Sequence, residues 1–493
     1  MKRSVIVLAL LLVLGITGTC FAHTSVNAAR DQVSFTETVV YGDRAAADGL
    51  RIETGANYDS HLHWDSATTF TADSHTTQTD YHFTYAPEQI IRVSDPNGLS
   101  MSTLNEHYLD LDAQEDTLSG LALAYRELYD ATKPGEQGEM TIDLADYYDY
   151  YPLSIMLELP GFWFSGSFEH DYILDDPDLT NVSAGPEFWD EQELLKTFHD
   201  FFRIPVPKNQ LYTIHISRPM NSHGGLGYGG GWGASDSAPT QEIYYLSSTS
   251  ALTDDACYFT IAGCTDEGTP VDTSLIPGGF GIYKLPFTQH EDKATEVHSE
   301  DLATVYPFEP TREVLWLETA CNDTVLMLLT RDAETACTLT SIDIATMETI
   351  QTHTFDYGGA VWNVRDFEDF LYLSLSDSSF LLLELYADGT FAERIHAQQL
   401  PEELTHKYYY TLNYSAMDWN GEQFAFTYWL TDADAHRETC GFYLMVYDET
   451  GLLYCGEYES SLTPWFDPQG YSSRYCSADG SRGITVSWDT EQN

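Results

Sequence analysis

The 493-residue chain has very few basic side chains. Lysine and arginine together number 22 against 77 aspartates and glutamates, so the formal net charge at pH 7 is −55. Neutralising a nucleic-acid backbone requires a basic face, and so few cations cannot supply one. Anionic lipid headgroups are disfavoured as partners for the same reason. Nucleic acid is therefore excluded as a partner, and membrane association is expected only through an N-terminal anchor.

Long apolar runs are also scarce. One run, from Val5 to Ile16, follows a basic start and is followed by small residues and Cys20. This order is typical of an export signal, whereas a membrane-spanning helix needs about 20 apolar residues. We expect residues 1–22 to be a signal peptide. The protein is then exported, and is either secreted or attached to the outer face of the cell membrane by an uncleaved anchor or a lipid on Cys20.

Cysteine is absent between the predicted signal peptide and Cys257. Of the eight cysteines, Cys20 lies in the predicted signal, so seven remain. No Cys-x-x-Cys pair occurs, so neither a zinc knuckle nor a thioredoxin-like motif is indicated. Export permits disulfides, and Cys257 lies close enough in sequence to Cys264 for a local bridge. The other pairings stay open, and the odd number leaves one thiol unpaired or paired with another chain.

Helical periodicity is scarce too, and short alternating segments dominate. Two helices are predicted, over residues 118–132 and over residues 187–202, where apolar side chains recur at helical spacing. The fold class is therefore mainly β. Nine segments rich in β-branched and aromatic residues predict strands: residues 33–41, 80–86, 161–167, 211–217, 257–263, 324–331, 370–376, 424–430 and 483–488.

The C-terminal part repeats a unit of two strands joined by a polar turn. Residues 321–346 parallel residues 367–390, both parallel residues 419–451, and a last unit over residues 477–488 stops after one strand. A spacing of about 45 to 60 residues is typical of the blades of a β-propeller. We expect β-propeller-like repeats in the C-terminal half, closed by an N-terminal strand. A pair of β-sandwiches is the alternative.

Three regions are predicted along the chain. The signal peptide over residues 1–22 is followed by a β-rich N-terminal region over residues 23–205, which holds both helices, and by a propeller-like region over residues 206–493. The boundary is placed where a proline-rich segment follows the longer predicted helix. Alternatively, the N-terminal region contributes early blades that carry insertions.

The stretch DSHLHWDS, residues 59–66, alternates possible metal ligands with other residues. On a strand, Asp59, His61, His63 and Asp65 share one face and the apolar residues between them share the other. A His-x-His pair can place two imidazoles on one zinc ion. The α/β barrels that use this spacing need a strand–helix alternation that this chain lacks. We interpret the polar side as the solvent face of a half-buried strand, with a metal site as the alternative.

No catalytic or cofactor-binding residue is nominated by a motif. No Gly-x-Ser-x-Gly or His-Glu-x-x-His occurs. The glycine-rich stretch over residues 222–233 lacks the helix that a dinucleotide-binding motif requires, so we interpret it as a loop. Residues 110–116 and 175–181 are acidic but lack the glycine and glutamate of an EF-hand, and we expect solvated loops. No cofactor is expected, with Ca²⁺ and Zn²⁺ as the alternatives.

A dense aromatic stretch raises the question of sugar binding. Aromatic rings stack on sugars when they are exposed, but more often they pack in a core. We expect packing here, with ligand stacking as the alternative. The residues concerned are Tyr147, Tyr148, Tyr150, Tyr151, Phe162 and Trp163.

Three stretches of the chain resemble exported proteins of Gram-positive bacteria that have no assigned activity. They are GDRAAADGLRIETGANYDSHLHWDS (residues 42–66), DYYDYYPLSIMLELPG (residues 146–161) and FFRIPVPKNQLYTIHIS (residues 201–217). The resemblance implies a location in the cell envelope and transfers no catalytic residue.

The expected function is that of a non-enzymatic extracellular module that binds a ligand or protein, with an extracellular protein or a glycan as partner. Many β repeats, abundant aromatic side chains and the lack of a catalytic motif favour this interpretation. The alternative is an extracellular hydrolase that acts on glycans through a pair of carboxylates. With 77 acidic residues, the sequence does not identify such a pair.

Overall fold

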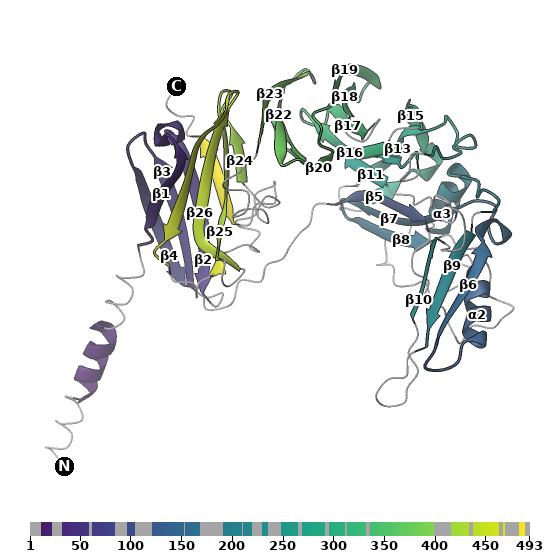
Figure 1. The fold of residues 1–493 in the computed structure, drawn as a ribbon, viewed down its shortest axis with the longest axis horizontal. Helices are drawn as coiled ribbons and strands as arrows, with labels where there is room; N and C mark the ends of the chain where they lie inside the picture. The colour runs from purple at the N-terminus through teal and green to yellow at the C-terminus, as the bar shows by residue number, and fades with distance from the viewer. Residues whose placement is uncertain are drawn as a thin grey trace, which may run out of the picture. The chain divides into compact units, whose positions relative to one another are not determined.

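The protein is mainly β, as the alternating segments predict (Figure 1). Each of the nine predicted strands overlaps an observed strand, and both predicted helices are present, as α2 (Leu121–Ala131) and α3 (Glu191–Phe201). The computed structural model describes residues 11–21, 32–58, 62–83, 96–103, 121–151, 153–167, 191–209, 211–218, 229–234, 248–264, 269–290, 295–310, 313–331, 336–398, 416–432, 437–462, 467–468 and 483–488.

The chain divides into two compact units. Unit 1 comprises Met1–Val93, Val361–Leu385 and Phe391–Asn493, and unit 2 comprises Ser94–Ala360 and Tyr386–Thr390. The predicted division at residue 205 does not coincide with this one. Strands on either side of that position pair along their whole lengths, because β6 (Gln137–Asp143) is hydrogen-bonded to β9 (Leu211–Ser217).

The described strands of unit 2 form four antiparallel sheets. The first two hold three strands each, in the orders β5-β7-β8 and β10-β9-β6, and the glycine-rich stretch predicted to be a loop supplies β10. Their bounds are β5 (Gly98–Thr103), β7 (Leu153–Leu159), β8 (Phe162–Ser167) and β10 (Gly229–Ala234). The third sheet contains β11 (Ser248–Leu252), β12 (Ala256–Ile261), β13 (Gly281–Gln289), β14 (Thr295–Val297) and β15 (Ala303–Pro307). The fourth contains β16 (Glu313–Ala320), β17 (Val325–Arg331), β18 (Cys337–Asp343) and β19 (Glu348–Phe355), in that order.

The helix α3 is held in unit 2 by aromatic packing. Phe198 lies in the last turn of the helix and Phe202 directly follows its final residue, and both side chains are fully buried. The Phe202 ring meets that of Tyr283 edge to face, with centroids 4.8 Å apart, and lies 5.9 Å from that of Phe259. The apolar stripe read from the sequence is therefore the face that the helix buries against β12 and β13.

The described strands of unit 1 form three antiparallel sheets. One has the order β20-β21-β22-β23, another the order β1-β27-β26-β25-β24, and in the third β28 and β29 both pair with β2, which continues to β3 and β4. The bounds are β1 (Phe35–Gly42), β2 (Leu50–Tyr58), β3 (Leu62–Phe70), β4 (His75–Phe83), β20 (Val361–Asp366), β21 (Phe370–Leu375), β22 (Ser379–Leu385), β23 (Phe391–Gln398), β24 (Ala416–Trp419), β25 (Phe424–Asp432), β26 (Arg437–Asp448), β27 (Gly451–Ser460), β28 (Asp467–Pro468) and β29 (Ile484–Trp488).

The propeller-like repeats are confirmed. The three repeats expected from the sequence are the inner strand pairs β17–β18, β21–β22 and β25–β26, each flanked by two outer strands in an up-and-down antiparallel order. This is the topology of a propeller blade. The inner strands are almost continuously apolar because both of their faces are covered, whereas the outer strand β19 alternates and is mostly exposed.

N-terminal and C-terminal strands pair within unit 1, as the single strand of the last repeat indicates. The strand β1 extends the sheet of β24 to β27 by pairing with β27. The strand β29 pairs with β2 from Leu50↔Trp488 to Thr54↔Ile484. The two ends of the chain thus contribute neighbouring strands to the same sheets.

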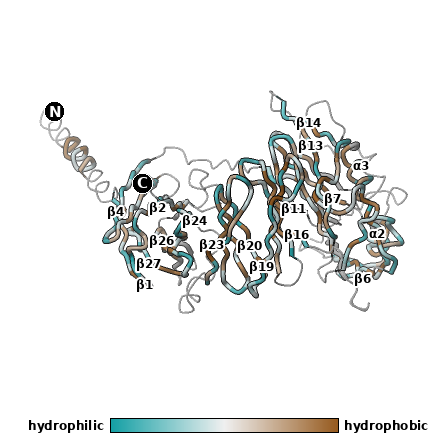
Figure 2. The backbone as a smooth tube through the Cα atoms, turned by 90° about the horizontal axis from the view of Figure 1, so that it is seen from above, coloured by the Kyte–Doolittle hydropathy of each residue, from teal (hydrophilic) through white to brown (hydrophobic). Residues whose placement is uncertain are grey.

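Residues 11–21 form an apolar helix with exposed side chains, coloured brown in Figure 2. Among the described residues, no helix is long and apolar enough to cross a membrane.

The local bridge that the sequence allowed between Cys257 and Cys264 is not formed, since both are free thiols. The strand β12 directs Cys257 into the core, where burial raises its pKa to about 12. The chain leaves the strand after Ile261, and the Cys264 thiol instead donates a hydrogen bond to the carbonyl of Pro310 at 3.0 Å.

Candidate functional site

The DSHLHWDS stretch contributes the start of β3. Asp59 and His61 lie outside the described residues. Trp64 faces the core, as the alternation predicts, with 1% of its surface exposed. His63 was expected to face solvent, but it is only 4% exposed. Its ring stacks on that of His82, its direct cross-strand partner on β4, with ring centroids 4.8 Å apart.

The predicted metal ligands are not gathered into a site in the described part of the chain. Asp65 is half-buried, and its Oδ2 lies 3.7 Å from Nδ1 of His82. Within the ranges that the structure describes, no group of three His, Cys, Asp or Glu side chains is arranged to hold a metal ion. The acidic stretches 110–116 and 175–181 lie outside these ranges.

A polar network that no sequence motif predicted joins the N-terminal strand β1 to the C-terminal strand β27. Glu37 on β1 accepts a hydrogen bond from the Tyr454 hydroxyl on β27 (2.8 Å), and its Oε1 lies 3.0 Å from Nε of Arg44. The Tyr458 hydroxyl lies 2.6 Å from that of Tyr454, whose own proton goes to Glu37, so Tyr458 donates to Tyr454. His75 closes the network, with Nδ1 3.4 Å from Glu37 Oε2. These bonds give the network a role in holding β1 against β27.

Three carboxylates with raised pKa values lie near strand ends of unit 1: Asp418 is half-buried, and Asp366 and Asp369 are exposed to solvent on one side. Both oxygens of Asp418, at the end of β24, accept backbone N–H bonds, from Trp419 (2.9 Å) and from Trp488 (2.7 Å). Burial raises the pKa of Asp418 to about 6, and the nearby Asp369 carboxylate adds to this effect. Burial also raises the pKa values of Asp369 and Asp366. Neighbouring carboxylates with raised pKa values are a feature of acid–base sites.

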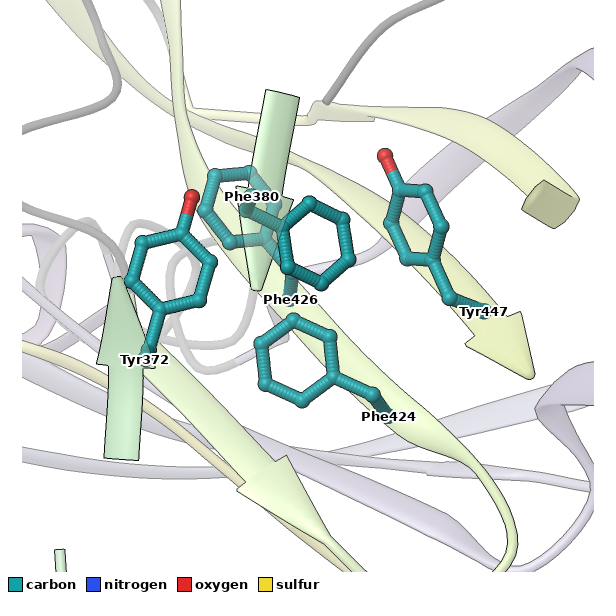
Figure 3. A pocket seen from close by; sticks show the side chains of 5 residues that line it. All are labelled: Tyr372, Phe380, Phe424, Phe426 and Tyr447. Carbon is teal, nitrogen blue, oxygen red and sulfur yellow. The ribbon is translucent and has the colours of Figure 1, made fainter. Parts of the chain in front are cut away.

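An aromatic pocket in unit 1 is closed to ligands. Figure 3 shows the three phenylalanine rings lying between the two tyrosines. The pocket has no room for a water molecule, and its lining side chains are all buried. It is a packing contact between β21–β22 and β25–β26, since its lining residues are Tyr372, Phe380, Phe424, Phe426 and Tyr447.

Of the six residues of the aromatic stretch, three are buried, Tyr147 and Tyr150 are half-buried, and one is exposed. Tyr148, Tyr151 and Phe162 are buried, as expected. Trp163 is 42% exposed. It lies on β8, whose neighbouring residues Phe162 and Phe164 face the core, so the alternation of the strand turns the Trp163 indole outward.

The sheet β5-β7-β8 (Figure 1) carries the carboxylate of Glu158 on the same side as this indole. Glu158 on β7 is the direct cross-strand partner of Trp163, and both pair in register with Gly98 on β5. Asn97 donates to Oε2 of Glu158 from its side-chain Nδ2 (2.7 Å) and from its backbone N–H (3.3 Å). In the next row lies Met156, which is also exposed.

We refer to Asn97, Met156, Glu158 and Trp163 as the Trp163 face. Its inner counterpart is apolar, because Leu157 and Phe164 are buried in the core of unit 2. Two neighbouring side chains of the outer side, Trp163 and Met156, are exposed and hydrophobic, and they lie beside an oriented carboxylate. The sequence contained the signal, as an FWF triplet whose central residue must face opposite to its neighbours.

Comparison with known proteins identifies no family. No family model matches the chain, and no curated protein matches it. Among solved structures, the N-terminal domain of Nup159 is similar over 43% of this chain and 57% of its own (14% identity, TM-score 0.21). Human WBSCR16 is similar over 40% of this chain and 48% of its own (10% identity, TM-score 0.21).

A structure from work on two prolyl endopeptidases is similar over 82% of this chain and 54% of its own (10% identity, TM-score 0.20). The chain thus spans about half the length of these three structures. With TM-scores near 0.2, the similarities carry no argument about function.

Proposed function

We propose that the protein is an exported, non-enzymatic module that binds glycans through the Trp163 face. The observation that carries the proposal is the outward position of Trp163 directly across from Glu158, whose carboxylate is oriented by Asn97. An exposed indole stacks on the apolar face of a pyranose ring, and a fixed carboxylate beside it accepts hydrogen bonds from the sugar hydroxyls.

The surrounding sheet is suited to a flat ligand. The strands β5, β7 and β8 contain no lysine or arginine, and the register aligns serines in the rows beside Met156, namely Ser100, Ser102 and Ser154. A regular sheet also holds these positions more rigidly than a loop does.

Binding to a carbohydrate array by residues 23–493 tests this proposal. We expect Trp163→Ala to abolish specific binding, a loss of at least about tenfold, because stacking of one aromatic ring contributes about 1.5 kcal/mol. Trp362→Ala is the matched control, since Trp362 is 71% exposed on β20 in the other unit. Binding by the wild-type chain that survives Trp163→Ala, or no binding to any glycan, would reject the proposal.

Export rests on the basic start and apolar run at the N-terminus. We expect mass spectrometry of the protein secreted by a bacterial host to find a mature chain that begins at His23. A chain recovered only from the cytoplasm, with its N-terminus intact, would contradict export and leave the glycan-binding test unaffected.

A second candidate is a glycan hydrolase that uses the Asp418 and Asp369 carboxylates of unit 1. It is favoured by the pKa of about 6 at Asp418 and by the neighbouring Asp369, because a general acid needs a raised pKa. Release of reducing sugars by the wild-type chain, abolished in Asp418→Asn, would establish this function. Binding without release would leave the carboxylates with a structural role.

A further inference from the structure

We propose that the Trp163 face selects glycans that carry a protonated amine, that is, glucosamine-type sugars rather than their N-acetylated or acidic counterparts. The inference rests on the proposed glycan binding and adds the class of sugar. It is carried by the pairing of an oriented carboxylate with an exposed indole on three strands, β5, β7 and β8, that contain neither lysine nor arginine.

The carboxylate of Glu158 is oriented with one oxygen left for a ligand. Both hydrogen bonds from Asn97 end on Oε2. Among the described residues, Oε1 has no hydrogen-bond partner. The Glu158 side chain is half-buried, so its position is fixed while this oxygen remains open to a donor. An ammonium group offers three donors and a positive charge, and such charge-assisted bonds are shorter and stronger than those from a hydroxyl.

The indole of Trp163 supplies a second attraction for the same group. Side chains directly opposite each other on antiparallel strands have Cβ atoms about 5 Å apart. A small cation held against the Glu158 carboxylate therefore lies within reach of the indole face. Tryptophan is the strongest of the aromatic side chains in cation–π attraction. The remainder of the sugar ring can stack on the same indole.

The charge of the protein favours the same choice. The formal net charge is −55, and β5, β7 and β8 contain neither lysine nor arginine to pair with a uronate or sulfate. Acidic glycans are repelled by this field, whereas cationic ones are attracted to it. An N-acetyl group removes the ligand's charge and one of its strongest donors, so acetylation should weaken binding.

Tryptophan fluorescence titration with glucosamine oligomers and with N-acetylglucosamine oligomers of equal length tests the inference on the full chain. For the wild-type chain we expect about fivefold tighter binding of the glucosamine oligomer, the size of effect that an exposed ion pair of up to 1 kcal/mol gives. The preference should shrink in high salt. Glu158→Gln should weaken binding of both oligomers, and that of the glucosamine oligomer more, so that the preference disappears, because the neutral amide oxygen can still accept bonds from Asn97 and from sugar hydroxyls but offers no charge to an ammonium group.

The outcomes separate this inference from the proposed function. Equal affinity for the two oligomers, or tighter binding of the acetylated one, overturns amine selection while glycan binding stands. Loss of binding in Trp163→Ala, with the preference intact in Glu158→Gln, likewise overturns the role of the carboxylate. Binding of polylysine without binding of either oligomer overturns both and indicates a basic protein as the partner.

Discussion

At the scale of single residues, unit 1 buries several ionisable side chains. Glu37 is held by Tyr454 and lies against Arg44, and Asp418 is held by two backbone N–H groups. The two sites differ in charge balance. Glu37 has a basic neighbour, whereas the nearest charge that affects Asp418 is the carboxylate of Asp369, so the ionised form of Asp418 is disfavoured.

The raised pKa of Asp418 predicts a pH-dependent stability. The folded value of about 6 lies above the ordinary value, so between about pH 4 and pH 6 the native state binds more protons than the unfolded state. The free energy of unfolding should therefore fall as pH rises through this window, by about 3 kcal/mol for this group. Asp418→Asn should reduce the fall, measured by urea unfolding at a series of pH values.

The control for this prediction has the opposite sign. Bonds from Thr346 lower the pKa of Asp343, so its ionised form is favoured in the native state. Asp343→Asn should thus remove a gain in stability that occurs as pH rises towards about 4, and should leave the fall between pH 4 and pH 6 nearly unchanged. A pH profile that is unchanged in Asp418→Asn would show that Asp418 is already ionised at pH 4 in the native protein.

At the scale of elements, hydrophobic alternation in the sequence located many of the strands, but which strands lie next to each other is set by hydrogen bonding between distant segments of the chain. The alternation in residues 33–41 predicts β1, but its partner β27 lies more than 400 residues away in the sequence, and the register is fixed by the contacts they share. Gly42 marks this contact. It has φ +73°, and a Cβ there would lie 1.8 Å from the carbonyl oxygen of Leu453.

Gly42→Ala should therefore loosen the pairing of β1 with β27. The added methyl group clashes with backbone and the φ value is unfavourable for alanine, and together they should destabilise unit 1 by about 3 kcal/mol. Gly49→Ala is the matched control, because Gly49 has φ +82° but nothing within 4 Å of an added Cβ, so it should cost about 1 kcal/mol.

Hydrogen exchange of the β1 and β27 amides, together with the unfolding midpoint, measures this difference. Faster exchange in Gly42→Ala than in Gly49→Ala is the expected result. If the two variants exchange alike, the close approach of Gly42 to Leu453 does not restrict this strand pair.

At the scale of the whole molecule, the charge of −55 is the dominant property. Self-repulsion of so many carboxylates opposes the compact state, and the 22 basic residues are too few to offset it locally. The same field attracts cationic ligands, which links the composition to the proposed selection of amine-bearing sugars.

Salt should stabilise this protein. Between about 20 mM and about 500 mM NaCl the Debye length falls from roughly 20 Å to roughly 4 Å, which screens repulsion between surface carboxylates. The thermal unfolding midpoint should rise by several degrees over this range at pH 7. Potassium chloride of equal ionic strength should act alike if screening is the cause. A midpoint that is flat or falls with NaCl would show that repulsion does not limit stability.

The sequence by itself determined the positions of nine strands, two helices and the blade-like repeats, because hydrophobic alternation and turn residues act over a few neighbouring positions. The incomplete last repeat also predicted that the two ends of the chain supply paired strands. The sequence missed β10, whose glycine-rich residues carry no such alternation. It placed Trp64 and three residues of the aromatic stretch in the core. It did not determine that His63 would be buried, that Cys257 and Cys264 would remain apart, or that Trp163 would face outward beside an oriented carboxylate. Alternation defines two faces of a strand, but the neighbouring elements decide which face is covered, and those neighbours come from distant parts of the chain.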